Sequence, residues 1–132
     1  MSSFPDESAE LTHILVVKDS STSRTWYENT LGAEIHGEYG SSVVLKFLGN
    51  WMLLVEEGGP TEDKPDVTMT FPNSTEVVHH SFTIRVKDCN KTYADLKDRG
   101  AVFLTEPVDH GAEIRAFFRD PDGHLYEISE KV

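Results

Sequence analysis

Residues 119–129 read R-D-P-D-G-H-L-Y-E-I-S, and this stretch carries the strongest structural signal in the chain. The D-P-D-G turn at 120–123 fits type I, because Asp stands at its first position, Pro at its second and Gly at its fourth. An apolar run precedes the turn and an alternating run follows it, so the stretch predicts a β-hairpin. On its second arm Leu125, Glu127 and Ser129 share one face. A carboxylate fixed in a half-buried strand needs a cation, a metal or several hydrogen-bond donors as partners.

An internal repeat is the second informative feature. The tripeptide Val-Lys-Asp occurs at 17–19 and 86–88, each time after an apolar run and before a stretch with helical spacing, and both stretches end in Gly-Ala, at 32–33 and 100–101. The offset between the copies is therefore 69 residues at the start and 68 at the end. Asp or the polar residues after it can cap each helix, and each Gly can end it in the left-handed conformation. We expect the same unit twice.

Hydrophobic periodicity predicts the order β-α-β-β-β for each unit. The first unit should hold a helix at 22–31 and strands near 11–17, 34–38, 42–48 and 51–56, with a hairpin turn at Gly49-Asn50. The second should hold a helix at about 90–99 and strands near 82–86, 102–104, 113–119 and 124–129. Residues 58–76 contain three prolines and predict a linker, in which alternating Val67, Met69 and Phe71 allow an edge strand.

Composition indicates one domain, residues 1–132, with module one at about 11–57, a linker at about 58–77 and module two at about 78–130. No apolar run is long enough to cross a membrane, and the first ten residues lack the pattern of a signal peptide. Cys89 is the only cysteine, so no disulfide framework is expected and a cytoplasmic location is the default. The net charge of −11 argues against nucleic acid and anionic membranes as partners.

Together, the tandem βαβββ repeat, the opening L-T-H-I-L-V-V-K-D, the following W-Y-E-N-T-L-G and the closing R-D-P-D-G-H-L-Y-E-I-S resemble the vicinal oxygen chelate superfamily. That superfamily includes glyoxalase I, ring-cleaving dioxygenases, fosfomycin-resistance enzymes and bleomycin-binding proteins. The resemblance covers residues 11–129. It implies an α+β fold in which two modules form a curved, incomplete mixed β-barrel around a concave pocket, with helices on the outer face. It also implies a small-molecule ligand and a homodimer.

Metal-binding members of this family hold a divalent ion with two His and one or two Glu from the first and last strands of each module. We place these ligand positions on the chain by aligning the Asp after each first strand and the D-P-D-G turn. The last ligand position then falls on Glu127. The remaining positions fall on Thr12, Leu54 and Ser81. His13 stands one residue after Thr12 and His80 one residue before Ser81. A one-residue shift turns a side chain to the other face of a sheet, so both histidines are expected on the helix side unless a β-bulge intervenes.

Two hypotheses for the site remain open. In the first, Glu127, His80 and His13 hold Zn, Ni, Fe or Mn, with Glu127 as ligand or catalytic base. In the second, no metal is bound, and Glu127 pairs with Arg85 or Arg115 in a pocket for polar or anionic ligands. The missing metal ligands favour the second hypothesis. The first is favoured because metal binding is common among proteins of the family that the chain resembles. The other residues expected to contact a ligand are Thr12, Ser81, Phe117 and Trp51. His110 and His124 are expected on the surface.

The function implied is that of a glyoxalase/bleomycin resistance/dioxygenase-like protein that binds a small molecule. Three forms of this function remain open. The first adds metal-assisted lyase, isomerase or dioxygenase chemistry, and the second is metal-free binding or sequestration of the resistance type. In the third the pocket is vestigial and the protein acts through its dimer surface. Glyoxalase I activity itself is not expected, because too few of its metal residues and no glutathione-binding pattern are present. Fold resemblance by itself does not decide among these.

Overall fold

The computed structural model describes residues 4–132. Its elements follow the predicted tandem order, with one further short strand, β7, that the sequence does not predict. Module one comprises β1 (Thr12–Val17), α1 (Ser20–Leu31), β2 (Glu34–Tyr39), β3 (Ser42–Phe47) and β4 (Asn50–Glu56). Module two comprises β5 (Ser81–Arg85), α2 (Cys89–Asp98), β6 (Val102–Phe103), β7 (Val108–Asp109), β8 (Glu113–Arg119) and β9 (Leu125–Lys131). Neither of these helices is long and apolar enough to cross a membrane.

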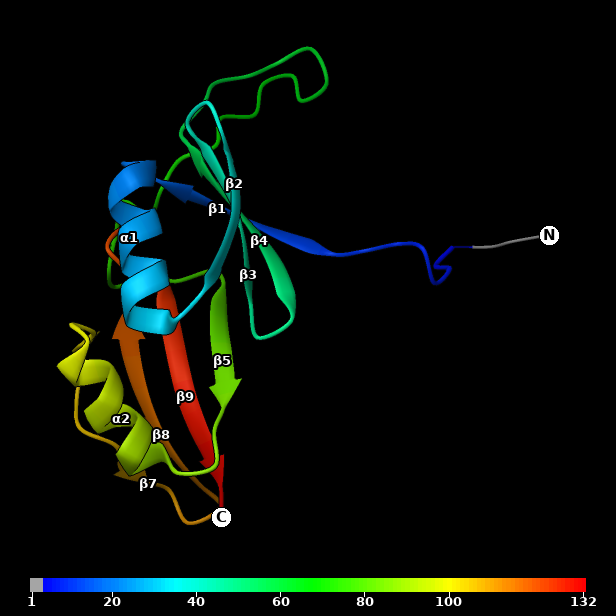
Figure 1. The fold of residues 1–132 in the computed structure, drawn as a ribbon. Helices are drawn as coiled ribbons and strands as arrows, with labels where there is room; N and C mark the ends of the chain where they lie inside the picture. The colour runs from blue at the N-terminus through cyan, green and yellow to red at the C-terminus, as the bar shows by residue number, and fades with distance from the viewer. Residues whose placement is uncertain (1–3) are drawn as a thin grey trace.

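Each module builds one sheet, and the two sheets repeat the same topology. Their strand orders are β1-β4-β3-β2 and β5-β9-β8-β6, with β7 paired to β8. The first strand of each module lies parallel to the last strand, and the other pairs are antiparallel. In Figure 1 the sheet of module one lies above the sheet of module two, and α1 and α2 lie on the same side of the two sheets. The α+β class with helices on one face is confirmed, and the sheets do not close into a barrel.

The repeated sequence signals mark the helix ends. Asp19 accepts hydrogen bonds from the backbone N–H groups of Ser21 and Thr22, and Asp88 accepts one from Lys91. Gly32 ends α1 with a φ of 72°, in the left-handed region that glycine adopts at little cost. The repeated Val-Lys-Asp sequence therefore starts both helices in the same way. Their ends differ, because α2 is capped by Arg99 in the right-handed helical conformation and Gly100 follows it with a φ of 105°.

The core lies between the sheets and the helices. Alternate residues of β1, Leu15 and Val17, are buried there, as are Tyr126 and Ile128 of β9. Leu54 of β4 is also fully buried, so the metal-ligand position that the resemblance placed on it is a core position here. The opposite face of each sheet carries no helix (Figure 1); we call it the open face.

Two local expectations from the sequence are wrong. The β3–β4 hairpin turns at Leu48-Gly49, whose φ values of 50° and 78° match a type I′ turn, while Asn50 already pairs with Phe47 in the ladder. The second error concerns the linker, where the alternating residues 67–71 form no strand. A single antiparallel bridge joins Met69 to Gly58 instead.

The D-P-D-G turn, residues 120–123, also joins the two modules. Asp122 accepts hydrogen bonds from the Lys18 backbone N–H at 2.8 Å and from the Ser23 hydroxyl at 3.1 Å. Asp120 accepts one from the Tyr27 hydroxyl at 2.7 Å. All three donors belong to module one. The turn that defines the last hairpin therefore fixes the position of module one against module two, and we call it the junction turn.

Candidate functional site

Glu127 lies in the middle of β9, on the open face of the second sheet. Thr83 of β5 and Phe117 of β8 stand opposite it on the two neighbouring strands. The Thr83 hydroxyl donates a hydrogen bond to Glu127 Oε1, and Arg115 Nε lies 4.0 Å from Oε2. The Glu127 side chain is 17% exposed. A hydroxyl and a cation thus satisfy this half-buried carboxylate, as one of the two hypotheses from the sequence requires.

A second carboxylate extends this arrangement along β8. Arg115 Nη1 donates to Glu113 Oε1 at 2.9 Å, and the buried Ser129 hydroxyl donates to Glu113 Oε2 at 2.9 Å. These hydrogen bonds, first from Ser129 and then from Arg115, lower the pKa of the Glu113 carboxyl, and the charge of Arg85 adds to the effect. Arg115 therefore lies between two carboxylates. The Glu127 cluster, as we name it, comprises Thr83, Glu113, Arg115, Phe117, Glu127 and Ser129.

Other residues expected to contact a ligand lie elsewhere on the open face. Ser81 and Arg85 are exposed on β5, beside Leu125 and Ser129. Thr12 and Trp51 pair across β1 and β4, in the sheet of module one. The Trp51 indole already donates to Glu10 at 2.8 Å, and the Lys46 ammonium lies 4.8 Å from its ring centre. The structure thus gathers Glu127, Arg115 and Phe117 and leaves Thr12 and Trp51 in the other sheet.

His13 and His80 lie on the helix side of the sheets. Both rings contact Phe82, with centres 5.3 and 4.9 Å from that of Phe82, which packs against the core. The β1–β4 ladder runs through His13 without a register shift, and the β5–β9 ladder does so from Ser81 onward, so neither ladder contains a bulge that would turn a histidine toward Glu127. Within residues 4–132, no group of three or more His, Cys, Asp or Glu side chains is arranged to hold a metal ion. One chain alone therefore does not assemble the His, His, Glu set that the resemblance implies.

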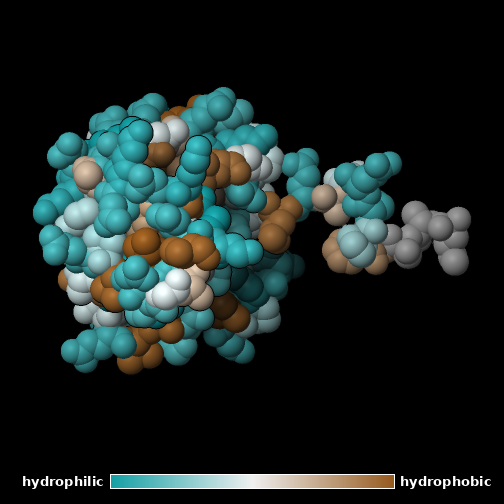
Figure 2. Space-filling view, turned by 90° about the horizontal axis from the view of Figure 1, so that it is seen from below, coloured by the Kyte–Doolittle hydropathy of each residue, from teal (hydrophilic) through white to brown (hydrophobic). Residues whose placement is uncertain are grey.

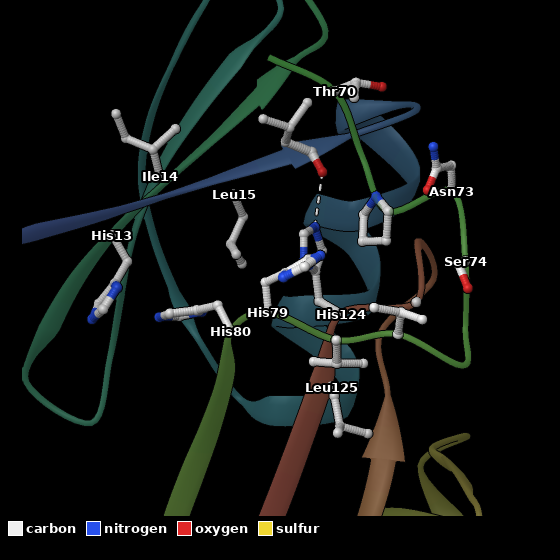
Figure 3. Close-up of a pocket in the computed structure, with 15 residues that line it drawn as sticks. His13, Ile14, Leu15, Thr70, Asn73, Ser74, His79, His80, His124 and Leu125 are labelled. Atoms are coloured by element: carbon white, nitrogen blue, oxygen red, sulfur yellow. Dashed lines mark hydrogen bonds between the residues drawn. The ribbon is translucent and has the colours of Figure 1, made fainter. Parts of the chain in front are cut away.

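A cavity of about 630 Å³ lies at the junction of the modules (Figure 3). β1, the linker, the start of β5 and the start of β9 surround it. Its lining contains no Asp, Glu, Lys or Arg but includes the four histidines His13, His79, His80 and His124. We call it the junction cavity. A smaller cavity of about 200 Å³ shares His13 with it and extends to Phe82 and Tyr126.

His124 differs from its expected surface position. The ring is half-buried, and its Nε2 lies 2.8 Å from the Val16 carbonyl oxygen. In the sequence, the feature that relates to this contact is that His124 directly follows the junction turn. Thr83, Glu113 and Ser129 were likewise not singled out as site residues, although Thr83 and Ser129 share the predicted face with Glu127. His110, by contrast, is exposed as expected.

Comparison with known proteins gives consistent results for sequence and fold. The sequence profile of the Glyoxalase/Bleomycin resistance protein/Dioxygenase superfamily matches residues 10–128. The glutathione transferase FosA of Serratia marcescens is 26% identical over 119 residues, covering 89% of this chain and 78% of the relative. Biphenyl-2,3-diol 1,2-dioxygenase 3 of Rhodococcus globerulus is 29% identical over 104 residues, covering 78% of this chain and 53% of the relative. The chain thus spans about half the length of that dioxygenase.

A solved structure shows the same fold. The fosfomycin resistance protein FosX of Listeria monocytogenes, crystallised with Mn(II) and sulfate, superimposes with a TM-score of 0.66 at 20% identity, covering 94% of this chain and 91% of the other. At this level of identity the likeness establishes the architecture of the two modules and leaves the chemistry of the site to be argued from the residues themselves.

Proposed function

The chain belongs to the Glyoxalase/Bleomycin resistance protein/Dioxygenase superfamily, and on that premise we propose that it binds a small polar or anionic molecule at the Glu127 cluster. The observation that carries the proposal is the pairing of a half-buried carboxylate with a cation on a sheet face that no helix covers. Ion pairs in such positions are typical of sites that fix the orientation of a polar ligand.

The cluster offers complementary groups to such a ligand. Arg115 is 38% exposed and donates to Glu113 through one terminal nitrogen, so its guanidinium retains further N–H donors for a carboxylate or phosphonate group. Glu127 accepts hydrogen bonds only, and it suits a ligand hydroxyl. Phe117, whose ring centre lies 5.9 Å from the Arg115 guanidinium carbon, supplies an apolar wall. The expected ligand therefore carries an anionic or carbonyl oxygen together with a hydroxyl group.

The proposal includes a homodimer. Apolar residues lie at the surface among hydrophilic ones (Figure 2). On the open face, Ile14 of β1 and Val108 of β7, which pairs with Arg115, are 52% and 45% exposed, and a monomer would leave them in water. A second copy laid over this face would cover them and enclose the Glu127 cluster. We expect sedimentation velocity to show a dimer, and Ile14→Glu to shift the protein to a monomer. A wild-type chain that sediments as a monomer at micromolar concentration would contradict this part of the proposal.

Metal-assisted catalysis is the second candidate function. A relative named as a dioxygenase and a similarly folded structure with Mn(II) favour it. The residues of one chain do not fit the His, His, Glu centre, however, because His13 and His80 lie on the face opposite to Glu127. Lyase or dioxygenase chemistry at Glu127 would therefore need further metal ligands from a second chain.

Ligand binding by defined variants distinguishes the two candidates. A panel of hydroxy acids and phosphonates would be screened by ligand-observed NMR against the wild type, Glu127→Gln and Arg115→Gln. We expect both substitutions to weaken binding at least about tenfold, a loss of roughly 1.4 kcal/mol. Arg24→Gln is the matched control, because it removes a surface arginine that is also paired, with Glu38 at 2.8 Å. Equal binding by all four proteins would refute the site.

Metal analysis tests the second candidate separately. Inductively coupled plasma mass spectrometry would be applied to untagged protein purified without chelator, and to Glu127→Ala. Near-stoichiometric zinc, nickel, iron or manganese that is lost in the variant would support catalysis at Glu127. A metal-free protein that stays folded after dialysis against these ions would support the metal-free binding function.

A further inference from the structure

The junction cavity differs from the Glu127 cluster in both position and chemistry. None of the six residues of that cluster lines the cavity, whose walls come from β1, the linker and the starts of β5 and β9. Figure 3 shows that the lining side chains come from segments far apart in the sequence. The volume of about 630 Å³ lies within the range of about 300–1,000 Å³ that is typical of small-molecule pockets. By size and position the cavity is a candidate binding site in its own right.

We propose that the junction cavity binds an uncharged aromatic molecule that carries a hydroxyl or carbonyl group. The site does not rest on the function proposed for the Glu127 cluster, because either site can bind its ligand while the other fails. Three features of the lining carry the proposal: apolar walls, the lack of charged side chains among the described residues that form it, and several imidazole rings.

The walls of the cavity are largely apolar. Leu15 of β1 and Leu125 of β9 line it from the two sheets, and Val77 and Val78 line it from the linker. The two valines are 61% and 41% exposed, so water contacts apolar side chains at the mouth of the cavity. A ligand with an apolar ring would displace this water and cover the valines, which is favourable.

The ligand should carry no net charge. The described lining contains no Asp, Glu, Lys or Arg, so a charged group would lose its hydration without gaining an ion pair. The net charge of the chain, −11, adds a long-range repulsion against anions. The junction cavity therefore selects a different class of molecule from the anionic or carbonyl ligand expected at the Glu127 cluster.

The imidazoles supply the polar contacts and flat surfaces of the site. The ring of His124 is engaged by the Val16 carbonyl oxygen, whereas in the part of the chain that the structure describes the ring nitrogens of His79 and His80 make no hydrogen bond. A neutral imidazole offers one donor and one acceptor nitrogen, which suit a ligand hydroxyl or carbonyl oxygen. The rings of His13 and His80, with centres 5.8 Å apart and planes tilted by 49°, favour a planar ligand, because aromatic rings attract one another in such offset contacts.

An arginine holds the linker wall of the cavity in place. Arg119, the last residue of β8, donates from Nη2 to the Thr75 carbonyl oxygen at 2.6 Å and from Nη1 to the Gly123 carbonyl oxygen at 2.9 Å. It thereby ties the linker to the junction turn, and Gly123 itself lines the cavity. A wall that is fixed before binding lowers the entropic cost of taking up a ligand. This role also accounts for a linker longer than a plain connection between two modules needs.

Three matched probes test the chemical class of the ligand. Isothermal titration calorimetry of the full chain would use 2-naphthol, 2-naphthoate and decahydro-2-naphthol at about pH 8, where an ordinary imidazole is neutral. We expect one molecule of 2-naphthol to bind per chain. The charged 2-naphthoate and the non-aromatic decahydro-2-naphthol should each bind at least tenfold more weakly. No binding of 2-naphthol, or equal binding of 2-naphthoate, would overturn the proposal.

Two linker variants test the place of the site. Val78→Asp puts a carboxylate into the apolar wall and should weaken 2-naphthol binding at least tenfold. Val67→Asp is the matched control, because Val67 is a 49% exposed linker valine that does not line the cavity, and it should bind 2-naphthol like the wild type. Unchanged binding in Val78→Asp, or an equal loss in Val67→Asp, would contradict the proposal.

Glu127→Gln separates the junction cavity from the Glu127 cluster. It should bind 2-naphthol like the wild type even where it loses the hydroxy acids and phosphonates of the first screen, and a loss equal to that of Val78→Asp would place 2-naphthol at the wrong site. As a second measurement, 2-naphthol should shift the backbone amide NMR signals of residues 13–16, 72–80 and 123–125. Shifts confined to Thr83, Arg115 and Glu127 would overturn the proposal as well.

Discussion

At the scale of single residues, the open face of module two shows how charged side chains are accommodated in a strand. Glu127 has the Thr83 hydroxyl and the Arg115 guanidinium near its two oxygens, and Glu113 has Ser129 and the same Arg115. A single arginine therefore serves two carboxylates. Since both ion pairs are partly exposed, their contribution to the free energy of unfolding is small.

The first prediction concerns the pKa of Glu113. Arg115→Gln should raise this pKa toward the ordinary value for Glu, because it removes a hydrogen bond and a positive charge from the carboxylate. The pKa would be measured by carbon-detected NMR titration of the side-chain carboxyl. Ser129→Ala should raise it too, since the Ser129 hydroxyl is the largest cause of the depression.

The sign of the linked stability effect follows from the depressed pKa. The contribution of Glu113 to the free energy of unfolding is present above the pKa of Glu in the unfolded chain, about 4.3, and is lost as the pH falls through the lower folded value. The acid-side decline of stability should therefore be shallower in Arg115→Gln than in the Arg24→Gln control. A Glu113 pKa that is identical in wild type and Arg115→Gln would contradict the prediction.

At the scale of elements, the repeated Val-Lys-Asp sequence has a specific physical role. In both modules the Asp follows the first strand with an extended backbone and accepts hydrogen bonds from the first turn of the helix. Such caps satisfy N–H groups that have no partner within the helix. The strand, cap and helix thus form a local unit that each module can specify on its own.

The second prediction is that Asp19→Ala lowers the free energy of unfolding by about 0.5–2 kcal/mol, because it removes the acceptor for two N–H groups of α1. Urea denaturation followed by circular dichroism would measure the loss. Asp19→Asn should restore most of it, since the amide oxygen can also cap. Asp95→Ala, an exposed position within α2, is the control. The cap would have no role in stability if Asp19→Ala and Asp95→Ala unfolded at the same urea concentration.

At the scale of the whole molecule, the junction turn is the main polar connection between the modules. Tyr27 of α1 donates to Asp120, and the Tyr126 hydroxyl lies 2.9 Å from that of Tyr27. Burial raises the pKa of both tyrosine hydroxyls, so they remain protonated donors at neutral pH. Because the three groups are buried together, each depends on the others for its hydrogen bonds.

The third prediction is that Tyr27→Phe destabilises the protein by about 1–3 kcal/mol, because it leaves the buried Asp120 and Tyr126 groups without this partner. The measurement is again the free energy of unfolding in urea. Tyr39→Phe is the matched control, since Tyr39 is 69% exposed, and its effect should be negligible. If both variants lost the same stability, the buried hydroxyl network would not hold the modules together.

Local sequence patterns were sufficient to predict the two modules. Each strand and helix is encoded by residues close in the chain: apolar alternation for the strands, Asp caps and a terminal Gly for the helices, and D-P-D-G for the last hairpin. The same alternation placed Glu127 on one face of β9 and His13 on the other side of β1 from Thr12. These features depend on side-chain direction within a strand, which has a period of two.

The tertiary structure alone decided which of these residues meet. The partnership of Glu127 with Thr83 and Arg115 depends on how β5, β9 and β8 align, and the approach of His13 to His80 depends on how two separate modules pack. The path of the linker and the burial of His124 depend on the same packing. No periodicity in the sequence records distances between segments about 70 residues apart, because those distances are set by long-range packing and hydrogen bonds across the junction.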